Sequence, residues 1–291
     1  MKSAPFEYAR AASLAEACDL LARYGGDSKV LAGGQSLVPM MAMRLVRPAF
    51  LVDINEIDEL KFVVIETDFC RIGACTRQMT IERNDWLGAR VPLLRQALAW
   101  VGHAQTRNRG TVGGSLAHAD PSAELPLAAR VLGAKMTLRS SKGARTLDAE
   151  QFFTGPMSTL VRPDECLEEI HWPVWNGNRT GSAFTEIAIR HGDFAMVAAA
   201  AQVALDSSDR CTRAAFGLGG ASGTPLAFPE IAVRLVGTKL EDKAIDAAAD
   251  DAAAETDPGS DLHATKEYRR HLARVLAARA LREARDRAVR Q

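Results

Sequence analysis

The sequence has no excess of either charge, because 36 Lys and Arg residues balance 36 Asp and Glu residues among 291. This balance gives no general attraction to nucleic acid or to acidic membrane surfaces. No apolar run reaches the length of about 18 residues that a membrane-spanning helix needs. The first residues also lack the apolar core of a signal peptide, so the sequence predicts a cytoplasmic protein with no membrane span.

Cysteine is scarce, and its five positions are scattered along the chain. An odd, unevenly spaced set predicts free thiols in a reducing compartment. Cys70 and Cys75 have the spacing of part of a plant-type iron–sulfur motif, but the third cysteine of that motif is absent. We interpret both as strand residues. The histidines show no paired ligand spacing, so we expect no metal on this chain.

Two glycine pairs stand out against this background. They lie in residues 32–37 (AGGQSL, the first glycine segment) and residues 111–116 (TVGGSL, the second glycine segment). Paired glycines can adopt positive φ and let a ligand approach the backbone, and successive free N–H groups form a concave anion site. Gln35, Ser36 and Ser115 add side-chain donors. Two such segments would suit a long ligand with an internal pyrophosphate, although each pair alone could be a simple turn.

Other nucleotide and hydrolase motifs fit less well. In residues 217–223, Ser222 replaces the third glycine of a dinucleotide-binding motif, and neither glycine segment has the G-K-[ST] ending of a P-loop. Ser115, His118 and Asp120 lie close in sequence, yet no serine completes G-x-S-x-G. Members of a catalytic triad usually come from separate elements, so a hydrolase is the weaker interpretation.

Local patterns predict an order of elements. Ser13 and Glu16 form a capping box that opens a helix, and Pro92 suits the first turn of another. Residues 195–205 are rich in alanine, and their periodicity leaves strand and helix both open. The last helix carries many arginines, which favours a solvated or partner-facing surface over a nucleic-acid site. Expected strands are 29–32, 50–54, 62–65, 69–73, 135–139, 166–171, 183–190, 195–205 and 211–218; expected helices are 14–24, 76–86, 92–102, 124–132, 229–236, 243–254 and 264–287.

Three motifs together resemble one family. Residues 32–41 resemble the first FAD loop of the flavoprotein subunits of molybdenum hydroxylases, the family of carbon monoxide dehydrogenase and xanthine dehydrogenase. Residues 105–121, followed by the triplet 124–126, look like the second FAD loop. Residues 190–195 (RHGDFA) are similar to the loop that shields the flavin. The likeness follows the family's order from about Pro5 to the C-terminal helix.

The resemblance implies a fold and its divisions. It implies an α+β protein with a two-subdomain FAD-binding fold of the vanillyl-alcohol-oxidase (PCMH-like) type. A C-terminal three-stranded antiparallel sheet with helices would follow. The expected divisions are FAD-binding subdomain 1 in residues 1–55, FAD-binding subdomain 2 in residues 56–175, and the C-terminal CO-dehydrogenase-flavoprotein-like domain in residues 179–291.

The resemblance also assigns roles to side chains. Val101 and Leu167 would pack against the cofactor, Asp120 and Glu124 would make polar contacts, and Phe194 would lie over the flavin ring. Val101 and Leu167 could instead be plain core residues, and Glu124 could simply cap a helix. No catalytic residue and no metal ligand is expected. The residues assigned to FAD are Leu31, Ala32, Gly33, Gly34, Gln35, Ser36, Leu37, Val101, Thr111, Val112, Gly113, Gly114, Ser115, Ala117, Asp120, Glu124, Leu167 and Phe194.

By the same resemblance, the chain would be the FAD-binding electron-transfer subunit of a heterotrimeric molybdenum hydroxylase. A large partner would carry the molybdenum cofactor and a small partner the [2Fe-2S] clusters, in a dimer of heterotrimers. Electrons would pass from those clusters to FAD and then to an external acceptor. The alternatives are a stand-alone flavin-dependent oxidase of the same fold and a non-enzymatic assembly protein with a degenerate flavin site.

Overall fold

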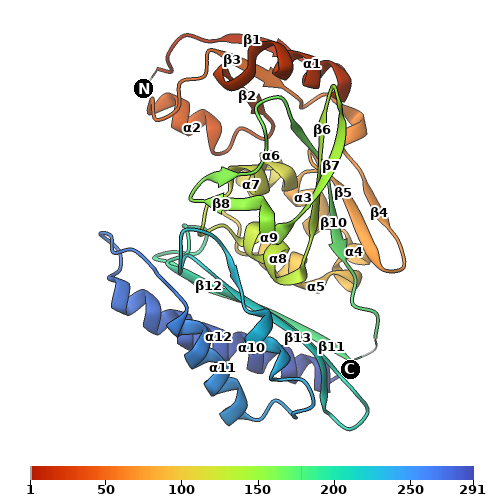
Figure 1. Cartoon of the computed structure of the whole chain (residues 1–291), viewed down its shortest axis with the longest axis vertical. Coiled ribbons are helices and arrows are strands. Elements are labelled where there is room, and N and C mark those ends of the chain that lie inside the picture. Colours follow the sequence, from red (N-terminus) through yellow and green to blue (C-terminus); the bar gives the residue numbers. More distant parts are fainter. Residues whose placement is uncertain (1, 178) are drawn as a thin grey trace.

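The computed structural model describes residues 2–177 and 179–291. Three larger sheets follow one another along the long axis of the molecule (Figure 1), with the N-terminal part at one end and the C-terminal helices at the other. A fourth sheet has only two short strands, residues 153–155 and 158–159. Helices and strands are mixed in an α+β arrangement. No helix within the described residues is both long enough and apolar enough to cross a membrane.

The first sheet is parallel, with strand order β1-β3-β2. The predicted capping box is confirmed: Ser13 Oγ accepts from the Glu16 N–H at 3.1 Å, and Glu16 Oε2 accepts from the Ala12 N–H at 2.7 Å. The helix that it opens buries Leu14 and Leu21. The elements are β1 (Glu7–Arg10), α1 (Leu14–Tyr24), η1 (Gly25–Asp27), β2 (Ser28–Leu31), α2 (Leu37–Ala42), β3 (Phe50–Asp53) and η2 (Asp58–Leu60).

The second sheet has the order β4-β5-β10-β6-β7 and is antiparallel. The helix expected over 76–86 is broken in two, because Asn84 Oδ1 accepts the Leu87 N–H at 2.9 Å and starts a new helix. Strand β7 was not predicted. The elements are β4 (Val63–Ile65), β5 (Phe69–Gly73), α3 (Gln78–Glu82), α4 (Asp85–Arg90), α5 (Pro92–Leu98), α6 (Ala104–Arg109), α7 (Val112–His118), α8 (Glu124–Leu132), β6 (Lys135–Ser140), β7 (Gly143–Asp148), α9 (Ala149–Phe152), β8 (Phe153–Gly155), β9 (Ser158–Thr159) and β10 (Cys166–Pro173).

The third sheet has the order β11-β12-β13-β14, also antiparallel. The expected three strands are present, and the two-residue β14 joins their edge. The alanine-rich segment is a strand, which resolves the ambiguity of the sequence. Helix α12 packs so closely on β11 that a Cβ at Gly181 would lie 1.9 Å from the Ala284 carbonyl oxygen. The elements are β11 (Thr180–Ile187), β12 (Val197–Leu205), β13 (Cys211–Gly219), β14 (Leu226–Ala227), α10 (Pro229–Val233), α11 (Asp242–Ala254) and α12 (Lys266–Val289).

The arginines of α12 pair mainly within the chain. Arg282 contacts Asp242 at 3.1 Å and Asp246 at 2.7 Å, both on α11. The buried face of α12 includes Leu272 and Leu276, as predicted, whereas Tyr268 is exposed rather than on that face. The arginine-rich composition therefore reflects, in large part, ion pairing between two neighbouring helices.

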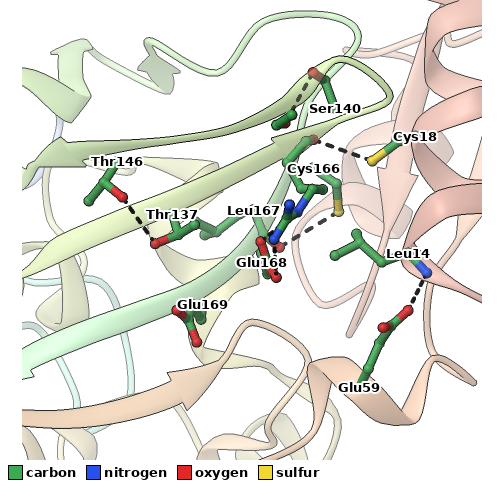
Figure 2. Close-up of polar contacts among 12 residues, drawn as sticks. Leu14, Cys18, Glu59, Thr137, Ser140, Thr146, Cys166, Leu167, Glu168 and Glu169 are labelled. Atoms are coloured by element: carbon green, nitrogen blue, oxygen red, sulfur yellow. Dashed lines mark hydrogen bonds and ion pairs between the residues drawn. The ribbon is translucent and has the colours of Figure 1, made fainter.

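A polar contact joins helix α1, which packs on the first sheet, to the second sheet (Figure 2). The Cys18 thiol of α1 donates to the Arg139 carbonyl oxygen of β6 at 3.3 Å. On the side of the first sheet, the Leu14 N–H of α1 donates to Glu59 Oε1 of η2 at 2.6 Å. All five cysteines are free and buried. Burial raises the pKa of the thiols of Cys18, Cys70 and Cys211 to about 11 and that of Cys75 to about 12, and it also raises the pKa of Cys166.

Candidate FAD site

The two glycine segments meet at one cleft with a volume of about 760 Å³. Its walls come from β2 and the first glycine segment, from α6 and α7, from residues 157–167, and from residues 192–194. The predicted site residues line it, apart from Leu31 and Val112. Segments that are far apart in the sequence therefore share one cavity.

The cleft volume of ≈ 760 Å³ falls within the range of about 300–1,000 Å³ that small-molecule and cofactor sites occupy. A separate cavity of about 390 Å³ lies between α5, β11 and α12 and is lined by Gln96, Trp100 and Glu186 among others. Of these two cavities, the larger one brings the glycine segments together.

The first glycine segment is open to a ligand. Within the described residues, the backbone N–H groups of residues 33–36 donate to no protein acceptor. Gly34 has a φ of +72°, a conformation that favours glycine, and Gln35 Nε2 donates to the Gly33 carbonyl oxygen at 3.1 Å. Successive free N–H groups beside a cavity form an anion site. The first glycine segment thus has free N–H groups and one positive φ, while its role in holding a ligand stays a prediction.

The second glycine segment differs from the prediction. It is not an open loop, because it forms the N-cap and first turns of α7, and neither Gly113 nor Gly114 has a positive φ. Its N–H groups are already used: Val112 donates to Thr76 O at 3.0 Å, Gly113 to Ala74 O at 2.9 Å and Gly114 to Thr111 Oγ1 at 3.0 Å. The expectation of two cradles lined by free amides is therefore wrong for this segment.

Close packing explains three of the glycines. A Cβ at Gly33 would lie 2.4 Å from the Arg109 carbonyl oxygen and 2.9 Å from the Gly110 Cα, and one at Gly113 would lie 2.5 Å from the Ala74 Cβ. A Cβ at Gly114 would come within 2.6 Å of the capping Thr111 hydroxyl. The first glycine segment thus packs backbone to backbone against the approach to the second.

Two carboxyl groups lie on the α7–α8 side of the cleft. Asp120 Oδ1 accepts the Ser122 N–H at 2.8 Å. Glu124, the first residue of α8, is only 8% exposed. Burial raises the pKa of Glu124 to about 7, the charge of Asp120 raises it further, and the backbone N–H of Glu124 itself opposes the shift. This carboxyl can therefore both donate and accept near neutral pH.

Apolar groups complete the wall. Val101 and Leu167 are buried in a core cluster and also line the cleft. Their positions are therefore compatible both with a core role and with contact to a cofactor. Leu167 precedes a register shift between β10 and β6 (Figure 2), and such bulges re-aim neighbouring side chains. Phe194 is 70% exposed at the cleft, next to a loop in which His191 stacks on Trp100 at 5.4 Å.

Sequence reasoning missed some of the lining. Lys29 and Arg162 place cationic side chains at the cleft. Gln78 is buried there, and its Oε1 atom has no hydrogen-bond partner among the described residues. Of these three residues, Lys29 alone could have been predicted from the sequence, because it lies in the strand that leads into the first glycine segment. Within residues 2–177 and 179–291, no cluster of His, Cys, Asp and Glu could hold a metal ion.

The residues present fit FAD. Free backbone N–H groups and nearby cations suit the pyrophosphate, and the unpartnered Gln78 oxygen and the Glu124 carboxyl suit hydroxyl or ring N–H groups. Val101, Leu167 and Phe194 offer apolar surface for an aromatic ring. The cleft therefore combines the kinds of contact that a dinucleotide with a charged pyrophosphate and aromatic rings requires.

Comparisons with known proteins cover nearly the whole chain. Residues 4–175 match the family model of the FAD binding domain in molybdopterin dehydrogenase, and residues 182–284 match that of the CO dehydrogenase flavoprotein C-terminal domain. The carbon monoxide dehydrogenase medium chain of Afipia carboxidovorans is 38% identical over 97% of this chain and 98% of its own length. The 6-hydroxypseudooxynicotine dehydrogenase complex subunit alpha of Paenarthrobacter nicotinovorans is 37% identical over 99% and 97%.

Solved structures agree with the sequence comparisons. A chain of carbon monoxide dehydrogenase from Hydrogenophaga pseudoflava superposes with a TM-score of 0.95 at 34% identity, covering 99% of both chains. A chain of quinoline 2-oxidoreductase from Pseudomonas putida gives a TM-score of 0.93 at 35% identity, again covering 99% of both. The similarity thus extends over both matched segments and the sheets that they contain.

Proposed function

This chain belongs to the family of FAD-binding medium subunits of molybdenum hydroxylases, and we propose that it receives electrons from iron–sulfur clusters of a partner subunit and passes them to an external acceptor. The resemblance noted in the sequence and the α+β fold are both confirmed. The chain is an oxidoreductase subunit with an FAD-binding domain.

In this proposal the residues of the chain bind and orient the cofactor. FAD, when bound, supplies the electron-transfer chemistry. The N–H groups of residues 33–36 hold the pyrophosphate, with Lys29 and Arg162 balancing its charge. Val101 and Leu167 pack on the ring system, Phe194 limits access to it, and the roles of all eighteen residues assigned to FAD stay part of the proposal.

No residue of the chain needs to act as a general acid or base in this role. Positioning and shielding suffice, since the reacting groups belong to the cofactor and to the partner subunits. The observation that carries the proposal is the row of free amides at residues 33–36, which faces a cleft shared with the second glycine segment.

The proposal extends to partners and organisation. We propose a large partner with the molybdenum cofactor and a small partner with [2Fe-2S] clusters, arranged as a dimer of heterotrimers in the cytoplasm. The carbon monoxide dehydrogenase relative is described as a medium chain, which supports a complex with larger and smaller subunits. The divisions at residues 1–55, 56–175 and 179–291 are retained as part of the same proposal.

Two measurements test this function. The absorbance spectrum of the purified chain should show one bound FAD, and native mass spectrometry of the complex should show two further subunits with iron and molybdenum. A chain that carries FAD but isolates alone, with its own substrate turnover, would support a stand-alone flavin oxidase. A chain that binds no FAD would contradict the proposal and support an assembly protein.

A further inference from the structure

A chain of hydrogen bonds outside the cleft connects the two glycine segments. Asn55, two residues beyond β3, donates from Nδ2 to the Ala32 carbonyl oxygen at 2.7 Å. Arg77 donates from Nη2 to Asn55 Oδ1 at 2.8 Å and from Nη1 to the Arg109 carbonyl oxygen. That Arg109 oxygen is the atom against which Gly33 packs. One amide and one guanidinium thus link residue 32 to residue 109.

The Asn55 amide is itself held in a fixed orientation. Asp53 Oδ1 accepts both the Asn55 N–H at 2.8 Å and the Asn55 Nδ2 group at 2.7 Å. The other oxygen of Asp53 accepts the Tyr8 hydroxyl. Because the amide is engaged at both ends, its contact with the first glycine segment cannot shift independently of Arg77.

The linkage stands apart from the cofactor surface. Asn55 and Arg77 are both half-buried, and neither is among the described residues that line the cleft. Arg77 also pairs through its backbone with Thr111, the N-cap residue of α7. Asn55 and Arg77 therefore lie next to both segments but outside the described lining of the cleft.

We propose that Asn55 and Arg77 are positioning residues that set the separation of the two glycine segments and thereby the affinity for FAD, without touching it. This inference rests on the proposed function for the identity of the ligand. A ligand that spans both segments should depend on their separation, whereas a fragment held mainly by the first segment should not. FAD and ADP provide that contrast.

The chain offers a matched control. Arg90 donates to a backbone carbonyl oxygen, that of Thr67 at 2.6 Å, and to an asparagine side chain, Asn176 Oδ1 at 3.2 Å. It is half-buried like Arg77 and does not line the cleft. Arg90→Gln therefore removes the same kinds of hydrogen bond at a place that does not connect the segments.

The first experiment titrates the full-length apoprotein with FAD and with ADP. We expect Asn55→Ala and Arg77→Gln each to weaken FAD binding by about tenfold, the equivalent of one or two hydrogen bonds, and to change ADP binding by less than about twofold. The double variant should bind FAD about as weakly as either single variant, because both interrupt one linkage. Arg90→Gln should leave both affinities unchanged. Equal losses for FAD and ADP, or unchanged FAD affinity, would overturn the inference.

A second measurement needs no cofactor. Amide hydrogen exchange of the apoprotein should speed up at Val38 and Met40, whose N–H groups donate to the Gly34 and Ser36 carbonyl oxygens, and in residues 109–115. Both regions should change together in Asn55→Ala and Arg77→Gln, and neither should change in Arg90→Gln. Exchange that changes in only one region would also reject the linkage. If the wild-type chain binds no FAD, the proposed function fails, while the exchange result still decides whether the two segments are coupled.

Discussion

Both glycine segments have a Gly-Gly pair followed by serine, after one further residue in the first segment and directly in the second. The two segments use glycine for different physical reasons. In the first, glycine permits a positive φ at Gly34 and leaves the backbone N–H groups free. In the second, glycine permits close packing against Ala74 and the Thr111 cap, and the N–H groups are satisfied by the protein. The first segment therefore keeps its N–H groups available for a ligand, whereas the second packs α7 tightly against its surroundings.

The largest effect should come from a charge at the contact between the segments. Gly33→Asp places a Cβ against the Arg109 carbonyl oxygen and a carboxylate beside the amides that would hold the pyrophosphate. We expect the purified variant to contain no FAD, and the same for Gly114→Asp. The flavin absorbance of each protein measures this. Stoichiometric FAD in either variant would contradict the placement of the cofactor.

A small uncharged substitution in the second segment should act mainly on stability. Gly113→Ala adds a methyl group that overlaps Ala74, and overpacking of this kind costs about 1–3 kcal/mol in the free energy of unfolding. Urea unfolding of the apoprotein measures the loss. Gly259→Ala is the control, because nothing lies within 4 Å of a Cβ at that position. A variant as stable as wild type would show that the packing argument is wrong.

Glu124, on the α7–α8 side of the cleft, should make the free energy of unfolding depend on pH. The first glycine segment has no titratable side chain and cannot contribute such a dependence. The pKa of Glu124 is raised from its ordinary 4.5 to about 7 by burial, so the folded chain binds this proton more tightly than the unfolded chain. Its contribution to stability is complete below the unfolded pKa and is lost as the pH rises toward about 7.

Glu124→Gln removes this ionisation. The fall in unfolding free energy between about pH 5 and about pH 8 should then be smaller by about 2–3 kcal/mol, because the proton is lost over about two pH units that are worth at most about 1.4 kcal/mol each. Urea unfolding at both pH values gives the comparison, and Glu255→Gln, at an exposed position, is the control. An identical pH dependence in wild type and Glu124→Gln would contradict the assignment.

The stability cost of the positive φ at Gly34 should be measurable apart from ligand binding. Gly34→Ala forces a residue with a Cβ into the left-handed region, which costs about 1–2 kcal/mol. Gly34→Asn meets the same neighbours at its Cβ but tolerates that conformation better, so we expect a smaller loss of thermal stability. Equal losses in the two variants would point to crowding by Val38 rather than to φ.

The smallest effect on affinity should follow from Phe194→Ala. This side chain is 70% exposed at the cleft and belongs to neither glycine segment. FAD affinity should change by less than about twofold, because little buried surface is lost. Reoxidation of the reduced flavin by oxygen or dyes should change, since the ring loses cover. Unchanged reoxidation rates would reject the shielding role.

Local signals in the sequence predicted much of the fold. The bounds of α8, residues 124–132, agree with the prediction, because Gly133 ends that helix in the left-handed conformation. Strand β7 escaped notice since it is a mostly exposed edge strand with few apolar residues. Helix α7 escaped notice because glycine disfavours helix, and here the Thr111 cap and the Ala74 contact outweigh that preference.

The site was predictable only where a motif marked it. The glycine segments and residues 120–124 carry recognisable patterns, and the structure brings them to one cleft. Gln78 and Arg162 reach the same cleft from elements with no motif, so only tertiary packing reveals them. The Asn55–Arg77 linkage is likewise invisible in the sequence, because it joins backbone carbonyl groups to side chains that are distant along the chain.

The placement of the cysteines gives the protein a set of built-in reporters. Cys18, Cys75 and Cys166 lie in the core beneath the first sheet, Cys70 in the core of the second, and Cys211 in that of the third. A thiol-alkylating reagent reaches each sulfur only when the surrounding core opens. Mass-spectrometric mapping of the alkylated positions at increasing denaturant would therefore reveal the order in which the three layers come apart, without any added label.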